Sequence, residues 1–151
     1  MTALHPSDDD SPPSAGEWAD LLAIATTPVR ELASSQLPED PGVYLWRHEG
    51  QVVYVGTAKS LRGRAWKRHL GGSRSLAASS LRRNVCELLF EIPPRVTSNP
   101  NREMVTQEQA TSIREWLRQC EVSWSVCATE KEASDLESRL RTEWLPQLNR
   151  V

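Results

Sequence analysis

Two short apolar runs separated by a polar segment predict a β-hairpin in the first half of the chain. Residues 43–46 and 52–55 are rich in valine and tyrosine, which favour extended strands. The polar segment 48–51 between them contains a glycine and has the composition of a tight turn. Because side chains alternate along a strand, this hairpin fixes the directions in which Tyr44 and Tyr54 point.

Apolar residues at helical spacing predict helices on both sides of the hairpin. A short amphipathic helix is expected to begin at Trp18, and longer helices are expected at 61–70, 77–89, 106–119 and 129–144. In the helix at 77–89, this spacing leaves Arg82 and Arg83 on the exposed side.

Local signals mark several of these helix ends. Ser60 can cap the helix at 61–70, and Thr106 with Gln109 and Thr129 with Glu132 match the capping box. The segment 91–101 contains three prolines and two asparagines, so it is expected to be a loop.

A third strand is expected near the C-terminus, where Val122, Trp124 and Val126 alternate with polar residues. With the hairpin it gives an α/β fold of the α+β type: a small three-stranded antiparallel sheet flanked by helices. Residues 1–16 are acidic and rich in proline and serine, and we expect them to be a disordered tail. Residues 17–151 are expected to form a single domain that begins with the N-terminal helix.

Composition narrows the setting in which the protein works. The sequence has no run of eighteen apolar residues and no basic segment followed by an apolar one at its N-terminus. Neither a membrane span nor a secretory signal is therefore expected, and we predict a cytoplasmic protein. Cys86, Cys120 and Cys127 are expected to be free thiols, because their number is odd and their spacing fits neither disulfides nor zinc.

The net charge of −2 conceals an asymmetry along the chain. Residues 1–41 carry eight acids and one arginine, whereas residues 57–86, called here the basic stretch, carry no acid. The basic stretch predicts contact with nucleic-acid phosphates, and a solvated basic face is the alternative. Within it, Trp66 is expected to pack into the core rather than stack on a base. Its basic residues are Lys59, Arg62, Arg64, Lys67, Arg68, Arg74, Arg82 and Arg83.

Four elements, in order and spacing, resemble the GIY-YIG nuclease superfamily. PGVYLW and VVYVGTAKSLRGR contain the two glycine–tyrosine elements, here GVY and YVG, and Arg64 follows the second tyrosine by ten residues. EASDLESRLRTEWLPQLNR contains Glu137 in a leucine–glutamate pair, and Asn149 after a proline. The resemblance covers about residues 38–150 and implies a three-stranded sheet with helices. HLGGSRSLAASSLRRNVCELL is similar to a subset of stand-alone bacterial members.

The resemblance implies a metal-dependent endonuclease that hydrolyses phosphodiester bonds of DNA. In that mechanism Glu137 binds one divalent cation, Mg²⁺ or Mn²⁺. Tyr44 and Tyr54 orient the attacking water, and one of them acts as general base with a pKa lowered by Arg64, Lys59 and the metal. Arg64 binds the scissile phosphate through two hydrogen bonds.

Two positions depart from the superfamily pattern. Members carry a histidine or tyrosine four residues after the arginine, and here that position is Arg68, followed by His69. A small helix shift would make His69 the proton carrier; otherwise it interacts with the helix C-terminus. Thr57 stands where DNA-repair members carry a lysine, and Lys59 is the nearest cation. Asn149 is expected to bind the substrate or to hold the C-terminal segment near the site.

These departures leave open a second interpretation, a nucleic-acid-binding module of the same fold with weakened catalysis. A third, a protein-interaction domain, is disfavoured by the basic stretch. We expect DNA as the partner, with RNA still open, and no membrane. Little room is left for sequence recognition, so a homodimer or a partner protein would supply specificity. The acidic N-terminal segment would compete with nucleic acid for the basic face.

Overall fold

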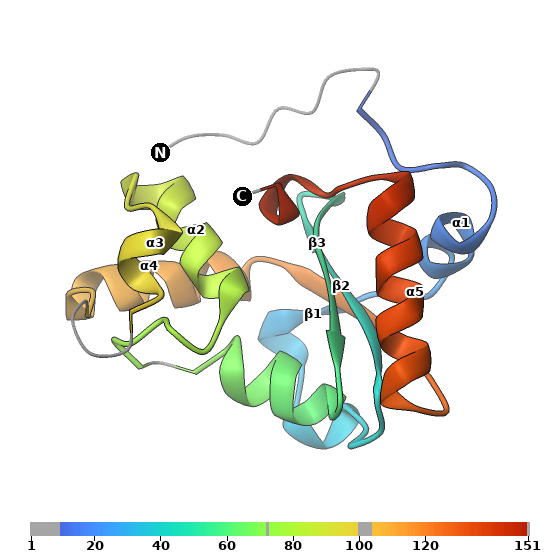
Figure 1. Cartoon of the computed structure of the whole chain (residues 1–151). Helices are drawn as coiled ribbons and strands as arrows, with labels where there is room; N and C mark the ends of the chain where they lie inside the picture. The colour runs from blue at the N-terminus through green and yellow to red at the C-terminus, as the bar shows by residue number, and fades with distance from the viewer. Residues whose placement is uncertain (1–9, 72, 100–103, 151) are drawn as a thin grey trace.

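The computed structural model describes residues 10–71, 73–99 and 104–150, and a small antiparallel sheet lies at its centre (Figure 1). Strands β2 (Gly42–His48), β3 (Gln51–Ala58) and β4 (Glu121–Val126) are the three that the sequence predicts. A two-residue strand, β1 (Thr27–Pro28), extends the sheet, giving the order β1-β4-β2-β3. Two residues carry no periodic pattern, so β1 had no signal in the sequence.

Helices surround the sheet, mostly where the apolar periodicity predicts them. Part of the segment 91–101 is helical, because a proline at the first helical position suits a helix start. The α-helices are α1 (Glu17–Leu22), α2 (Ser80–Phe90), α3 (Pro94–Thr97), α4 (Gln107–Arg118) and α5 (Glu130–Glu143), and the 3₁₀ turns are η1 (Val29–Glu31), η2 (Ser34–Gln36) and η4 (Gln147–Asn149).

The helix expected at 61–70 forms as a π-helix, η3 (Arg62–Arg68), and not as an α-helix. At its end, the N–H of His69 donates a hydrogen bond of 3.2 Å to the carbonyl oxygen of Arg64, five residues earlier. Such helices are rare and short, and they occur frequently at functional sites.

The hairpin of β2 and β3 closes through a two-residue turn, Glu49-Gly50. Both residues have positive φ, 52° and 80°, as a type I′ turn requires, and this turn matches the twist of its strands. Tyr44 pairs with Gly56, and Trp46 pairs with Tyr54. Both tyrosines therefore lie on the same face of the sheet, and the predicted hairpin is confirmed.

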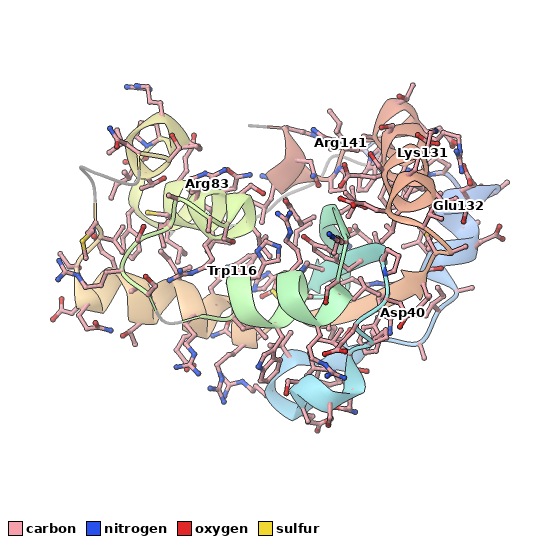
Figure 2. The ribbon with its side chains drawn as sticks, turned by 60° about the horizontal axis from the view of Figure 1, so that its bottom comes forward. Asp40, Arg83, Trp116, Lys131, Glu132 and Arg141 are labelled. Atoms are coloured by element: carbon pink, nitrogen blue, oxygen red, sulfur yellow. The ribbon has the colours of Figure 1, made fainter. Side chains whose placement is uncertain are left out.

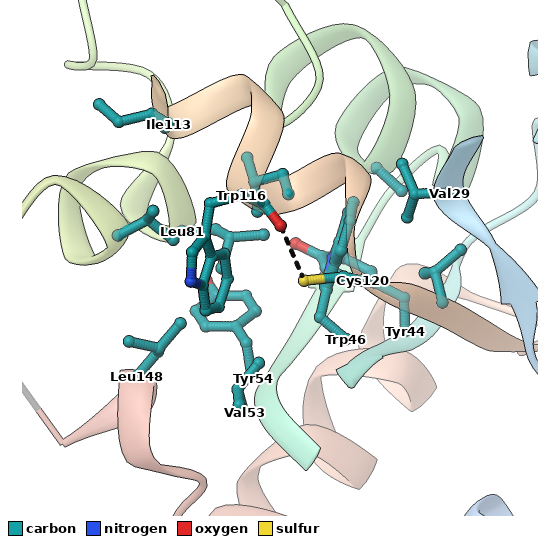
Figure 3. Close-up of a cluster of buried hydrophobic side chains, with 14 of the residues drawn as sticks. Val29, Tyr44, Trp46, Val53, Tyr54, Leu81, Ile113, Trp116, Cys120 and Leu148 are labelled. Atoms are coloured by element: carbon teal, nitrogen blue, oxygen red, sulfur yellow. Dashed lines mark hydrogen bonds between the residues drawn. The ribbon is translucent and has the colours of Figure 1, made fainter. Parts of the chain in front are cut away.

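Both faces of the sheet are covered. One face packs against α2 and α4 through the larger apolar cluster, which includes Tyr44, Trp46 and Tyr54 (Figure 3). The other face carries Val43 and Val55 and packs against α1 and α5. The hairpin strands are apolar on both sides because both sides are buried.

One capping box forms as predicted and the other forms in part. The Thr106 hydroxyl accepts from the N–H of Gln109, and the Gln109 side chain accepts from the N–H of Thr106, each at 3.0 Å. At α5, the Thr129 hydroxyl accepts from the N–H of Glu132, but the Glu132 carboxylate accepts from Ala128. Glu132 is therefore a capping acid, displaced by one residue from the box geometry.

Gly42 and Gly56 lie where their neighbours leave no room for a side chain. A Cβ at Gly42 would overlap the carbonyl of Ser125 and lie 2.8 Å from Cδ1 of Leu61. A Cβ at Gly56 would overlap the ring and hydroxyl of Tyr44, which lies across this residue from the neighbouring strand. Glycine at position 56 is therefore a condition for the position of Tyr44.

The thiols are free, as the sequence predicts. Cys86 and Cys120 are buried, whereas Cys127 is half-buried. Burial raises the pKa of Cys120 to about 12, so this thiol stays protonated and serves packing. Among the described residues, every helix is too short or too polar to span a bilayer.

The acidic N-terminal segment falls largely outside the description, because residues 1–9 are not among the described residues. The carboxylate of Asp10 accepts hydrogen bonds from Nη1 of Arg150 at 2.7 Å and from Nε1 of Trp144 at 2.9 Å. The bond from Arg150 holds the pKa of Asp10 below its usual range. Asp10 thus contacts the C-terminal region and not the basic stretch.

We predict that Gly56→Ala lowers the free energy of unfolding by about 1–3 kcal/mol, because the new methyl group overlaps Tyr44. Urea denaturation followed by circular dichroism measures this loss. Gly63→Ala is the control, because its Cβ would meet Oγ of Ser60 at an ordinary 3.4 Å. Equal effects of the two substitutions would contradict the assigned role of Gly56.

Candidate active site

Tyr44, His69 and Ser79 form a continuous hydrogen-bonded chain inside the protein. The Tyr44 hydroxyl lies 2.7 Å from Nε2 of His69, and Nδ1 of the same ring lies 2.6 Å from the Ser79 hydroxyl. The Ser79 oxygen also accepts a hydrogen bond of 3.1 Å from the N–H of Arg82. All three side chains of the chain are buried, so they are shielded from bulk water.

The π-helix η3 explains how His69 reaches Tyr44. In an α-helix the residue four positions after Arg64 would share its side of the helix, whereas in a π-helix that residue is five positions later. His69, five residues after Arg64, therefore lies on the same side of η3 as Arg64. Its role as the proton carrier in place of the fourth residue stays a prediction. The side chain of Arg68 lies outside the described part of the structure.

Tyr54 lies on the same face as Tyr44, with ring centroids 6.3 Å apart. Its hydroxyl is 2.6 Å from Oγ of Ser80 at the start of α2. Burial raises the pKa of Tyr54, and the charge of Glu137 adds to this, while Ser80 and Arg64 act in the opposite direction. Arg64 thus acts on Tyr54 in the predicted direction, but burial outweighs it and the pKa of Tyr54 is raised.

Glu137 reaches the same region from the other side of the sheet. It lies four residues after Ala133 and three before Leu140, both buried, so helical spacing turns it toward the sheet. Its side chain is 18% exposed and lies 3.9 Å from Nη1 of Arg141. Burial raises the pKa of Glu137, against the opposing effects of Arg141, of Arg64 and of the Thr57 backbone N–H. Tyr54, Arg64 and Glu137 are thus electrostatic neighbours at strand β3.

This donor set fits one hard divalent cation. Among the described residues, no group of three or more His, Cys, Asp or Glu side chains could enclose a metal ion. A lone carboxylate suits an ion such as Mg²⁺, which keeps several waters and takes substrate phosphate as a further ligand. The raised pKa of Glu137 fits as well, because a cation would offset the cost of burying its negative charge.

Asn149 holds the C-terminal segment against β3. Its Nδ2 donates to the carbonyl oxygen of Val55, and its Oδ1 accepts from the N–H of Val55, both at 2.9 Å. Of the two roles expected from the sequence, the geometry supports the structural one. Contact of Asn149 with nucleic acid stays a prediction, since one N–H of its amide is left for a further partner.

The expectation that Arg82 is exposed is wrong. The side chain is buried, and its guanidinium donates to the carbonyl oxygens of Ser73 and Ser75 in the loop before α2. Because Ser79 caps α2, the segment 73–78 stays non-helical and presents carbonyls that need donors. Arg82 therefore supports this loop and takes no part in an interface.

Other members of the basic stretch share this structural role. Arg62 donates to the carbonyl oxygen of Leu37 and pairs with Glu39, while Nε of Arg74 donates to the carbonyl oxygen of Val105. Arg83, which is half-buried, donates through Nη1 to the carbonyls of residues 76 and 77. Lys59 is exposed, and the side chains of residues 67 and 68 lie outside the described set.

A hollow of about 450 Å³ adjoins the tyrosines between α2 and α3. It is lined by Ser80, which bonds Tyr54, and by the guanidinium-bearing residues Arg83 and Arg95. Figure 2 shows Arg83 on α2 and Arg141 on α5, with strand β3 between the two helices. Basic side chains therefore stand on both sides of the strand that carries Tyr54.

The sequence analysis missed four residues of this site. Ser79 and Ser80 carried a usable signal, because serine before an apolar helical run marks an N-cap. Arg95 and Arg141 carried none, because their relation to the tyrosines depends on how α3 and α5 pack.

The structure brings Tyr44 and Tyr54 onto one face of the sheet and leaves the carboxylate of Glu137 half-buried. The family model described as GIY-YIG catalytic domain matches residues 21–150. The chain therefore belongs to the GIY-YIG catalytic domain family, and it is an endonuclease domain. The family resemblance in the sequence is confirmed.

Individual relatives agree with this assignment. The chain is 32% identical over 117 residues to the UvrABC system protein C of Bifidobacterium longum, which covers 77% of the chain and 11% of that protein. It is 34% identical over 118 residues to the same protein of Rhodococcus jostii, covering 78% of the chain and 12% of that protein. A 28-residue match to the Thermus thermophilus protein reaches 68% identity. The last match covers 18% of the chain and 5% of that protein, and the first two span about a tenth of the length of their relatives.

We predict that Glu137→Gln raises the melting temperature of the metal-free protein at pH 7. The folded-state pKa of Glu137 lies above the ordinary 4.5. The buried carboxylate therefore lowers the free energy of unfolding increasingly as the pH rises from about 4.5 through that raised pKa. Calorimetry at pH 7 and at pH 4 measures the effect, which is expected to vanish at pH 4. Exposed Glu31→Gln is the control, and a gain of equal size there would contradict the prediction.

Proposed function

We propose that this domain hydrolyses phosphodiester bonds of DNA with one divalent cation, Mg²⁺ or Mn²⁺, bound by Glu137. The observation that supports the proposal is the neighbourhood of Tyr54: its ring centroid lies 6.3 Å from that of Tyr44, and the charges of Arg64 and Glu137 act on its pKa. These side chains come from β2, β3, η3 and α5, and no structural need for burying a carboxylate beside a phenol is evident. DNA as the substrate is supported by exposed Lys59, which follows β3, and by Arg95, which lines the same hollow as Ser80.

The negative charge of the scissile phosphate would be neutralised by Arg64 and by the cation bound at Glu137. When bound, the cation would neutralise the phosphate and stabilise the leaving 3′-oxygen. Arg64 would hold two nonbridging oxygens of the scissile phosphate through the planar fork of its guanidinium. Its charge is available there because it acts on both Tyr54 and Glu137.

The two phenols divide the remaining work. Burial keeps Tyr54 protonated, so it would donate its hydrogen bond to the attacking water or the phosphate. Tyr44 would accept the proton of that water, after passing its own proton to Nε2 of His69. The Ser79 oxygen, which already accepts from a backbone N–H, would also accept from Nδ1 of His69 and so leave Nε2 free to act as acceptor.

The principal alternative is a nucleic-acid-binding module with weakened catalysis. The departures at Thr57, in place of a lysine, and at Arg68 motivate it. Thr57 acts on Glu137 through its backbone N–H and supplies no positive charge. The Tyr44–His69 bond supports the catalytic interpretation, because a pure binding module has no need of a buried proton relay. The domain would work in a reducing cytoplasm, with specificity supplied by a homodimer or a partner protein.

We predict that purified protein nicks supercoiled plasmid with Mg²⁺ or Mn²⁺, and that Arg64→Lys slows nicking about 100-fold, because lysine cannot fork onto a phosphate. Glu137→Ala is expected to abolish nicking. Gel electrophoresis of nicked plasmid measures both effects, and Arg139→Lys on the exposed side of α5 is the control. Binding of plasmid without nicking under either metal would favour the alternative.

The proposed division between the phenols predicts unequal losses. Tyr44→Phe removes the group that passes a proton and should lower the single-turnover nicking rate at least about 100-fold. Tyr54→Phe removes only a hydrogen-bond donor and should cost about tenfold. The two variants are matched, since each deletes one hydroxyl from one face of the hairpin. A larger loss for Tyr54→Phe would reverse the assignment.

A further inference from the structure

A second hollow, of about 330 Å³, lies on another side of the π-helix η3, between it, η1 and α4. Its apolar wall is formed by Val29, Leu32 and Leu70, together with the indole of Trp66. Guanidinium groups of Arg114 and Arg118 on α4 complete the lining, with Arg30 at η1. The hollow thus combines an aromatic surface with concentrated positive charge and has no acidic lining residue among those described.

The lining residues themselves do not balance this positive charge, because none of those described is acidic. Arg114 and Arg118 are four residues apart on α4, so like charges occupy one helix face at a cost in stability. Nε of Arg118 is buried and has no hydrogen-bond partner among the described residues. Arg30 differs, because it pairs with Glu115 at 3.2 Å. A buried donor without an acceptor is unfavourable, so an anionic ligand would stabilise this region.

We propose that this hollow binds one nucleotide of an unpaired strand of the DNA substrate. The base would pack against Trp66 and the apolar wall, and the adjacent phosphate would bind Arg114 and Arg118. This goes beyond the expectation that Trp66 only packs into the core: Trp66 is half-buried, and part of it lines the hollow.

The requirement for an unpaired strand follows from the shape of the site. A base within a duplex is stacked and paired, so its face cannot reach an indole in a hollow. A phosphate alone would leave the apolar wall without a partner, whereas an apolar ligand would leave the arginines without one. A nucleotide with an exposed base satisfies both.

The hollow is linked to the active site by η3. Arg64 acts on Tyr54 and Glu137, while Trp66, two residues later, lines the hollow with η1 and α4. A single helix separates the two sites, a width of about 10 Å. This inference rests on the proposed function and refines it: the substrate is DNA with an unpaired segment next to the cleaved bond.

Binding is tested without cleavage, in Glu137→Gln protein free of metal. Fluorescence anisotropy compares an oligothymidylate with an abasic oligomer of the same length and charge. We expect tighter binding of the oligothymidylate, by about tenfold. Trp66→Leu is expected to remove most of this preference, and melting curves of the variant establish that it is folded. Equal binding of both oligomers by protein with Trp66 intact would overturn the role of the base.

A matched pair of double variants tests the arginines. Arg114→Gln with Arg118→Gln is expected to weaken oligothymidylate binding about tenfold. Lys131→Gln with Arg139→Gln removes the same charge from exposed positions of α5 and is expected to change binding less than about twofold. Equal weakening by both doubles would mean that only overall charge matters, and the proposed hollow would be rejected.

The outcome is separable from that of the proposed function. The plasmid assay reports on catalysis at Glu137, whereas the anisotropy assay uses protein that lacks this carboxylate. Failure to nick plasmid alongside base-dependent binding would reject the nuclease mechanism and keep the hollow. Nicking alongside base-independent binding would reject the hollow and keep the mechanism.

Discussion

The hydrogen bond between the Tyr44 hydroxyl and Nε2 of His69 connects the elements on which the candidate site depends. It joins strand β2 to the helix η3, and through Ser79 it continues to the start of α2. Tyr44 can lie in this position only because Gly56 on the neighbouring strand has no side chain. His69 can meet it only because η3 is wound as a π-helix. The pairing of β2 with β3, the π-helical winding of η3 and the Ser79 cap of α2 are therefore all needed to form this one hydrogen bond.

Burial acts on the carboxyl and on one phenol of the candidate site. It raises the pKa of both Tyr54 and Glu137, and the nearby arginines only partly oppose it. A protein optimised for stability alone would not keep a carboxyl in such a place. The unfavourable burial of this carboxyl is confined to one place, and the apolar packing on both faces of the sheet offsets its cost in stability.

The sequence was informative wherever a local pattern decided the outcome. The hairpin, strand β4, the Thr106 box and the candidates Tyr44, Tyr54, Arg64 and Glu137 all followed from short motifs and their spacing. The π-helix could not be foreseen, because seven residues are too few to separate a period of 4.4 from one of 3.6. The burial of Arg82 was not predicted for another reason. Its partners are backbone carbonyls in a loop, and the sequence does not indicate which side chain they bind.

The outer edge of β3 is covered by the C-terminal segment and by the carboxylate of Glu137. Asn149 occupies the outward N–H and carbonyl of Val55, and Glu137 faces the outward N–H of Thr57. An open strand edge is a template on which another chain can add. These contacts of Asn149 and Glu137 thus also keep two molecules from joining their sheets at this edge. Loss of Asn149 would then appear first as self-association in concentrated solution, before any change in chemistry.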